Sequence, residues 1–276
     1  MFPCRPPTSS FRAMSVALSR TRATAYLQPL REGGSLPAVV ETGDGLFVAK
    51  FRGAGQGPRA LIAELVAGLV AREAGLPVPE LAVIEVPEGL ASEQGDPEIR
   101  DLVAASAGAN VGLRYLDGAF NFDARAAGDL VDPGLAADVV WLDAFLTNPD
   151  RTARNPNLLI WERRPWLIDH GSALYAHHAW DTVDDARTRT PFPAIRDHVL
   201  LRQAGDLEAA VEAHRAGALR GRADPDPSAL GRELERVRHV VVEHLLEPAG
   251  IEDQRVDLGR DARLDLDPAV RRGAAQ

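Results

Sequence analysis

Apolar and polar residues alternate in short runs along the first part of the chain, a pattern that predicts β-strands. Residues 24–30 (TAYLQPL) form one such run, and residues 36–51 (LPAVVETGDGLFVAKF) form two, joined at residues 42–45 (TGDG), which are typical of a hairpin turn. Residues 78–86 (VPELAVIEV) and a run that ends near Asp117 predict two further strands. Together these runs predict a small antiparallel sheet.

Helical spacing replaces the alternation in two longer segments. Residues 60–76 (ALIAELVAGLVAREAGL) repeat leucine every fourth residue, and Gly75 lies where such a helix would end. Residues 135–147 (LAADVVWLDAFLT) predict a second helix. Its apolar face comprises Leu135, Val139, Leu142 and Phe145. Similar patterns between residues 195 and 246 predict two or three more helices.

The order of these segments predicts an α+β fold with two lobes. A sheet lobe with one helix is expected at residues 22–117 and a mainly helical lobe at 118–248, where the apolar runs NLLIW and PWLID predict a hairpin. Residues 1–21 predict a disordered leader and residues 249–276 a mobile tail. Met14 is an alternative start to Met1.

Composition excludes several classes of protein. With 45% hydrophobic and 26% charged residues, the 276-residue chain has the composition of a folded, water-soluble protein. A net charge of -9 disfavours general nucleic-acid binding. The single cysteine, Cys4, rules out an intrachain disulfide, and the chain has no apolar run long enough to cross a bilayer and no signal peptide. We therefore expect a cytoplasmic protein.

Lys50 is the only lysine among 31 basic residues, and it ends a predicted strand. Lysine carries a compact ammonium where arginine carries a wide planar fork, so its retention indicates a site that needs a point charge. Glu64 lies in the middle of the first predicted helix, between apolar neighbours, where a charge requires a partner. The alternatives are an exposed strand lysine and an ordinary acid on the helix surface.

The segment TNPDRTARNPNLLIWERRPWLIDHG brings Asp150, Asn155 and Asp169 to a loop and the hairpin after it. Phosphoryl transfer needs one carboxylate to orient the attacking hydroxyl and oxygen ligands to hold Mg²⁺. The Asp-x₄-Asn spacing and the later Asp-x-Gly match the catalytic and metal-binding positions of protein kinases. Each motif alone is weak, but their order along the chain, after Lys50 and Glu64, predicts a kinase site.

Two long stretches resemble the HipA-like kinases: residues 33–81 (GGSLPAVVETGDGLFVAKF and the helix and strand that follow) and 147–175 (TNPDRTARNPNLLIW to DHGSALY). The likeness extends over roughly residues 24–246. It implies a protein-kinase-like two-lobed fold, use of ATP and Mg²⁺, and transfer to a serine or threonine. It also implies that Lys50 contacts ATP phosphates, that Asp150 is catalytic, and that Asn155 and Asp169 hold magnesium.

The sequence departs from the family pattern in two respects. Thr152 stands where the family usually has a histidine, two positions after the catalytic aspartate, and we expect no room for the extra N-terminal module of the long HipA toxins. The second departure weakens the inference of an antitoxin-like partner. Asn157 competes with Asn155 as the metal ligand, although the spacing favours Asn155.

Further nucleotide contacts are expected at the glycine turn and at the boundary of the lobes. The backbone of Gly33 and Gly34 can approach phosphates closely, and Ser35 beside them is a further candidate contact. The resemblance also implies autophosphorylation of a serine near this loop, but for Ser35 a plain turn serine is the preferred interpretation of that point. Backbone groups of Tyr115 and Asp117 are candidates for contacting adenine.

Other polar and aromatic residues receive simpler interpretations. His170, His177 and His178 lack the spacing of zinc ligands, the four tryptophans favour core packing, and Asp138 and Asp143 are expected to be surface or structural residues. Arg151 and Arg154 are either contacts to a phosphate or an acidic substrate, or ordinary surface charges. Three alternative functions are open: a small-molecule kinase, a silent nucleotide-binding regulator and, least favoured, a hydrolase that uses Asp150 and Asp169.

Overall fold

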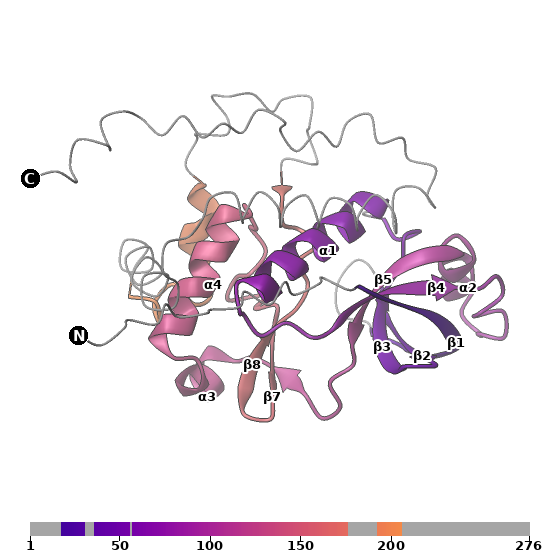
Figure 1. Ribbon diagram of the computed structural model, residues 1–276, viewed down its shortest axis with the longest axis horizontal. Helices are drawn as coiled ribbons and strands as arrows, with labels where there is room; N and C mark the ends of the chain where they lie inside the picture. The colour runs from indigo at the N-terminus through magenta and orange to yellow at the C-terminus, as the bar shows by residue number, and fades with distance from the viewer. Residues whose placement is uncertain (1–17, 31–35, 56, 176–191, 206–276) are drawn as a thin grey trace, which may run out of the picture.

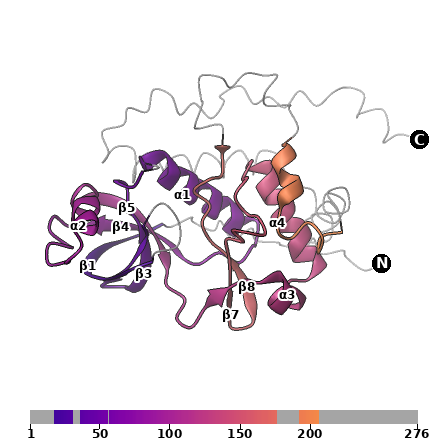
Figure 2. The same ribbon diagram turned by 180° about the vertical axis from the view of Figure 1, so that it is seen from behind.

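The computed structural model describes residues 18–30, 36–55, 57–175 and 192–205 of the chain. The fold is mixed α/β, with a sheet-rich N-terminal region that lies beside a region containing helices and a second small sheet (Figures 1 and 2). The leader up to residue 17, the glycine turn Gly33-Gly34-Ser35 and the tail expected at 249–276 lie outside the described residues, as does the part after residue 205 of the helices expected between residues 195 and 246.

Five strands form a closed barrel in the order β1-β2-β3-β5-β4. The strands are β1 (Ser19–Pro29), β2 (Ala38–Thr42), β3 (Gly45–Lys50), β4 (Leu81–Val86) and β5 (Gly108–Arg114). The prediction of a purely antiparallel sheet is wrong, because β1 pairs with β4 in parallel. β1 begins five residues before the expected strand, and these added residues hydrogen-bond to β4 while the later part of β1 pairs with β2.

The predicted hairpin between β2 and β3 is confirmed. The Thr42 hydroxyl donates to the Gly45 carbonyl at 2.9 Å and accepts from the Asp44 amide at 3.1 Å, and Gly45 has a φ of 108° that favours glycine. Inside the barrel, a Cβ on Gly112 would lie 2.5 Å from the Ile84 side chain. Glycine is therefore required at that position for β4 and β5 to pair closely.

The first predicted helix is α1 (Gly57–Glu73), which lies against the barrel (Figure 1). Leu61, Leu65 and Leu69 are buried in a core that also includes residues of β4, β5 and α4 (Pro133–Phe145). Gly75 has a φ of 83° just after the helix, as the sequence predicts. One core thus joins the barrel to the helical region and fixes their relative position.

The sequence interpretation missed helix α2 (Pro97–Ala104). Its start carries a recognisable signal, because Asp96 caps the Glu98 amide at 3.0 Å and Pro97 occupies the first turn. α2 packs Ile99 and Val103 onto a second core cluster within the barrel region.

Helix α4 begins two residues before its predicted start, after the cap Asp132. The prediction that Phe145 belongs to its buried face is wrong: Phe145 is 55% exposed and stacks on Trp141 with ring centroids 5.3 Å apart. The helix buries Ala136, Val139, Val140 and Leu142 instead, because its contact face is centred on these smaller residues.

The remaining elements form a small sheet and short helices. They are β6 (Phe120–Asn121), α3 (Ala124–Ala127), η1 (Gly128–Leu130), β7 (Leu158–Trp161), β8 (Arg164–Leu167) and η3 (Pro193–Asp197). β7 and β8 form the predicted hairpin, and both turn residues, Glu162 and Arg163, have positive φ. Trp161 and Trp166 pack edge to face on this hairpin, whereas Trp180 lies outside the described residues.

Candidate active site

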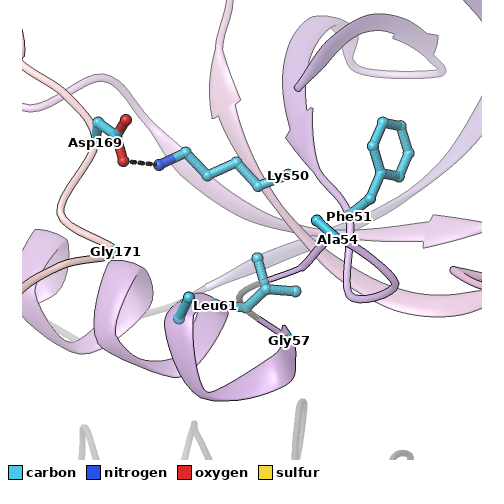
Figure 3. A pocket seen from close by; sticks show the side chains of 8 residues that line it. Lys50, Phe51, Ala54, Gly57, Leu61, Asp169 and Gly171 are labelled. Carbon is cyan, nitrogen blue, oxygen red and sulfur yellow. Dashed lines mark hydrogen bonds and ion pairs between the residues drawn. The ribbon is translucent and has the colours of Figure 1, made fainter. Parts of the chain in front are cut away.

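The predicted contact between Lys50 and Glu64 is present, and a third residue joins it. The Lys50 Nζ lies 2.6 Å from Glu64 Oε2 and 2.6 Å from Asp169 Oδ1. Figure 3 shows the Lys50 side chain reaching from the end of β3 toward Asp169, beside the first turns of α1. Lys50 and Asp169 border a pocket. Its lining residues are Lys50, Phe51, Ala54, Gly57, Ala60, Leu61, Asp169 and Gly171.

Burial and charge act in opposite directions on these three groups. Burial alone would lower the pKa of Lys50, but the carboxylates of Glu64 and Asp169 outweigh it and raise that pKa. Burial opposes ionisation of Asp169, yet the attraction of Lys50 lowers its pKa below the ordinary value. The complete burial of Glu64 raises its pKa despite the contact with Lys50. Lys50 therefore stays charged, and so does Asp169.

Asp169 is the member of this cluster that faces outward. Its side chain is 41% exposed, whereas that of Glu64 is fully buried. Its backbone has a φ of 55°, in the left-handed region, which costs a non-glycine residue on the order of 1–2 kcal/mol. Asp169 Oδ1 contacts Lys50, and among the described residues no hydrogen bond reaches its second carboxylate oxygen.

The loop after α4 brings Asp150 next to the two candidate asparagines. Asp150 Oδ2 accepts hydrogen bonds from Asn155 Nδ2 at 3.0 Å and from Asn157 Nδ2 at 3.2 Å. The Ser172 hydroxyl lies 3.5 Å from the same oxygen. Asn157 is buried and its amide also lies 3.5 Å from the Asp169 carbonyl oxygen, whereas Asn155 is exposed. Asn157 thus links Asp150 to Asp169, a contact that the spacing argument did not anticipate.

The interpretation of Arg151 as a ligand contact or a surface charge is wrong. Its side chain is fully buried, and its Nε lies 2.6 Å from Asp143 Oδ2. Its guanidinium also donates to the carbonyls of Asn157 and Ile168. Arg154, in contrast, is exposed.

Asp143, whose role the sequence left open, is structural. It accepts hydrogen bonds from Asn148 Nδ2 and His198 Nε2, both at 2.9 Å, besides its contact with Arg151. Burial opposes its ionisation, but Arg151 and His198 lower its pKa well below the ordinary value. The sequence carried one signal for this network, because Asp143 lies on a helix whose residues are all apolar apart from Asp143 and Asp138.

His170 is buried and neutral. Burial first, and then the charge of Arg151, lower its pKa to about 3. Arg151 Nη2 lies 3.4 Å from His170 Nδ1, so the proton of the neutral ring belongs on Nε2, which has no hydrogen-bond partner among the described residues. His177 and His178 lie outside the described residues.

The oxygen donors suit a magnesium ion better than a zinc ion. The described residues contain no group of three or more His, Cys, Asp or Glu side chains able to hold a metal by themselves. Magnesium needs only one or two protein carboxylates when phosphates supply other ligands. The second carboxylate oxygen of Asp169 and the amide oxygen of Asn155, whose Nδ2 faces Asp150, have this hard-oxygen chemistry.

The other predicted nucleotide contacts are not brought into this cluster by hydrogen bonds. Tyr115 and Asp117 follow β5, where the Tyr115 amide donates to the Leu46 carbonyl at 3.0 Å and the Asp117 carbonyl accepts from Trp161 Nε1 at 2.9 Å. In the part of the chain that the structure describes, neither shares a hydrogen bond with Lys50 or Asp169. Both stay predictions.

Comparison with known proteins identifies the class of protein to which this site belongs. Residues 26–188 match the model of a protein family described as HipA-like kinase, a range that covers more than half of the chain and includes Lys50, Glu64, Asp150 and Asp169. The class is therefore that of kinase-type phosphotransferases. The chain belongs to the HipA-like kinase family.

Two further findings complete the comparison. A search of curated proteins finds no match to the chain. Among the described helices, none combines the length and the apolar character needed to span a membrane.

Proposed function

We propose that the chain is an ATP- and Mg²⁺-dependent kinase that transfers the γ-phosphoryl group to the hydroxyl of a protein serine or threonine. One observation carries this proposal: the only lysine of the chain lies 2.6 Å from both a buried glutamate and Asp169. A compact ammonium held by a helix carboxylate, beside a carboxylate that faces outward, is the arrangement that kinases use to bind the phosphates of ATP.

Lys50 would neutralise phosphate charge, and Glu64 would keep its ammonium in place. Because Glu64 is completely buried, loss of either partner would leave an uncompensated charge in the interior, which is costly. Magnesium, when bound, would balance the negative charge that develops on the phosphates, and Asp169 with Asn155 would hold it.

Asp150 is the proposed catalytic residue. Its Oδ2 is occupied by the amides of Asn155 and Asn157, so Oδ1 is the oxygen that would accept the hydrogen bond of the acceptor hydroxyl. The hydroxyl oxygen bonds to the γ-phosphorus, the bond from that phosphorus to the bridging oxygen of ADP breaks, and the hydroxyl proton passes to Asp150. ADP and a phosphate ester are the products.

The proposal includes a two-lobed arrangement, with a sheet lobe expected at residues 22–117 that β1 extends back to Ser19, a helical lobe at 118–248, and flanking segments before the sheet lobe and at 249–276. The barrel supplies Lys50 and the region after α4 supplies Asp150 and Asp169, as a site between two lobes requires. A protein acceptor and an antitoxin-like partner come from family resemblance.

Phosphoryl transfer from labelled ATP with Mg²⁺ tests the proposal, with cell extract as the source of acceptors. We expect Asp150→Asn to abolish transfer while ATP binding persists, because this change removes the base and keeps the side-chain shape. Asp169→Ala should weaken both. Full turnover by Asp150→Asn would refute the assignment, and label found in small metabolites would replace the protein acceptor with a small molecule.

A further inference from the structure

The guanidinium of Arg151 contacts four different parts of the site. Its Nε lies 2.6 Å from Asp143 on α4, and Nη1 donates to the carbonyl of Asn157 and, at 3.4 Å, to that of Ile168. Its Nη2 lies 3.4 Å from His170 Nδ1. Lysine has no planar fork and cannot reach these groups together.

These contacts lie next to both carboxylates of the proposed active site. Arg151 directly follows Asp150, Asn157 holds the Asp150 carboxylate through its side chain, and Ile168 directly precedes Asp169. The backbone segments that contain Asn157 and Ile168 are also joined directly, by a hydrogen bond of 3.1 Å from the Ile168 amide to the Asn157 carbonyl. A shift of the guanidinium would therefore move Asp150 and Asp169 relative to one another.

Asp143 gives the guanidinium a fixed anchor. One of its oxygens accepts from Asn148, and the other accepts from Arg151 and His198. His198 Nδ1 accepts from the Leu200 amide at 3.0 Å, so the proton that His198 directs at Asp143 is on Nε2. The side chains of Asn148, Asp143, Arg151 and His198 are all buried. Water therefore cannot replace a hydrogen bond that is lost among them.

We propose that Arg151 is a positioning residue that sets the distance between the carboxylates of Asp150 and Asp169, with Asp143 as its anchor. This inference rests on the proposed kinase function for its kinetic consequence. This role replaces the two sequence-based interpretations of Arg151, as a contact to a phosphate or acidic substrate and as a surface charge.

Arg151→Lys is the test variant, since it keeps the positive charge and removes the planar fork. Ile99→Ala is the stability control, because Ile99 is buried in the barrel region, away from Arg151, and truncating it leaves a cavity that should destabilise the protein. Arg164→Lys, at an exposed position of β8, is the control for the chemical change.

Three quantities are measured at a temperature where each variant is folded: kcat, the Mg²⁺ concentration at half-maximal rate, and amide hydrogen exchange without nucleotide. For Arg151→Lys we expect kcat to fall about 10- to 100-fold and the Mg²⁺ requirement to rise several-fold, as when a ligand's supporting residue is lost. Exchange should accelerate in both 148–157 and 168–174. Ile99→Ala should change exchange in the barrel and leave kcat per folded molecule unchanged, and Arg164→Lys should match the wild type.

The exchange measurement separates this inference from the proposed function. If the wild type neither binds Mg²⁺-ATP nor transfers phosphate, the proposed function fails, and exchange in the variant still decides whether Arg151 joins the two segments. Unchanged exchange in either segment, or kinetics like those of Ile99→Ala, would overturn the positioning role. Should Arg151→Lys not fold, wild-type exchange decides: the two segments must open together, and independent opening rates refute the proposal.

Discussion

Two buried cations of this protein, Lys50 and Arg151, pair with carboxylates in opposite ways. The Lys50 ammonium contacts two carboxylates, those of Glu64 and Asp169. The Asp169 side chain is 41% exposed, and the backbone of Asp169 is in the left-handed region. Arg151 pairs with a single, fully buried carboxylate whose two oxygens both have other donors. The first pair can exchange one partner for a ligand, whereas the second has no position left for one.

The contrast shows that burial of an ion pair does not by itself indicate a binding site. What distinguishes Lys50 is an incomplete set of contacts around its partners: Asp169 has an oxygen outside the pair, and Glu64 Oε1 lacks a hydrogen bond in the described residues. The Arg151 pair has the opposite character and serves the architecture. Three experiments, taken from the largest expected effect to the smallest, test this distinction.

The largest effect is expected from Asp143→Ala, which leaves the Arg151 guanidinium buried without its carboxylate. Removing one partner of a buried ion pair costs about 3–5 kcal/mol of unfolding free energy. Urea unfolding measures this loss, and Asp101→Ala, an exposed position on α2, is the control and should stay within about 0.5 kcal/mol of the wild type. A loss below about 1 kcal/mol for Asp143→Ala would show that the two pairs do not differ as described.

Lys50→Arg should affect activity more than stability. The positive charge between Glu64 and Asp169 is kept, but the wide guanidinium cannot place a single charge where the ammonium lies. We expect phosphoryl transfer to fall roughly 100- to 1000-fold, the usual cost of one misplaced stabilising group. Initial rates with labelled ATP measure it. A variant that keeps the wild-type rate would mean that the compact ammonium is not needed.

The sequence predicted the Lys50 site because its signals are local. A strand end, a mid-helix glutamate and the Asp150 loop each follow from short patterns, and their order along the chain is informative. The barrel was missed because its closure depends on pairing between residues far apart, such as Arg20 with Val83, which no short pattern records. Helix α2 carried its own cap signal and was overlooked.

The Arg151 network was not predicted because an arginine has the same appearance in sequence whether it is exposed or buried. Its partner Asp143 lies on α4, and His198 lies in a segment separated from it by more than fifty positions. The prediction for Phe145 erred in the opposite sense, because helical spacing assigned this exposed aromatic residue to the buried face of its helix. Tertiary packing decides both cases, and spacing cannot anticipate it.

The smallest effect is a pH dependence that comes from His170, whose ring touches the Arg151 network. Its folded pKa is about 3 and its ordinary value is 6.5, so the unfolded chain binds more protons between these values. The stability that comes from keeping the ring neutral is complete well above pH 6.5 and is lost as pH falls, and about 1.4 kcal/mol of it is gone at pH 5.5. Arg151 and Lys50 favour the neutral ring, while Asp143 and Asp169 oppose it.

His170→Leu removes this titration and isolates it from all other groups. Urea unfolding of the wild type and the variant at pH 7.5, 6.5, 5.5 and 4.5 gives a difference curve in which shared titrations cancel. We expect the unfolding free energy of the wild type to fall relative to that of the variant as the pH drops below 6.5. The reason is that only the wild type has an imidazole that takes up a proton on unfolding. A flat difference curve would mean that the His170 ring is not held neutral, and that solvent reaches the buried contacts around Arg151.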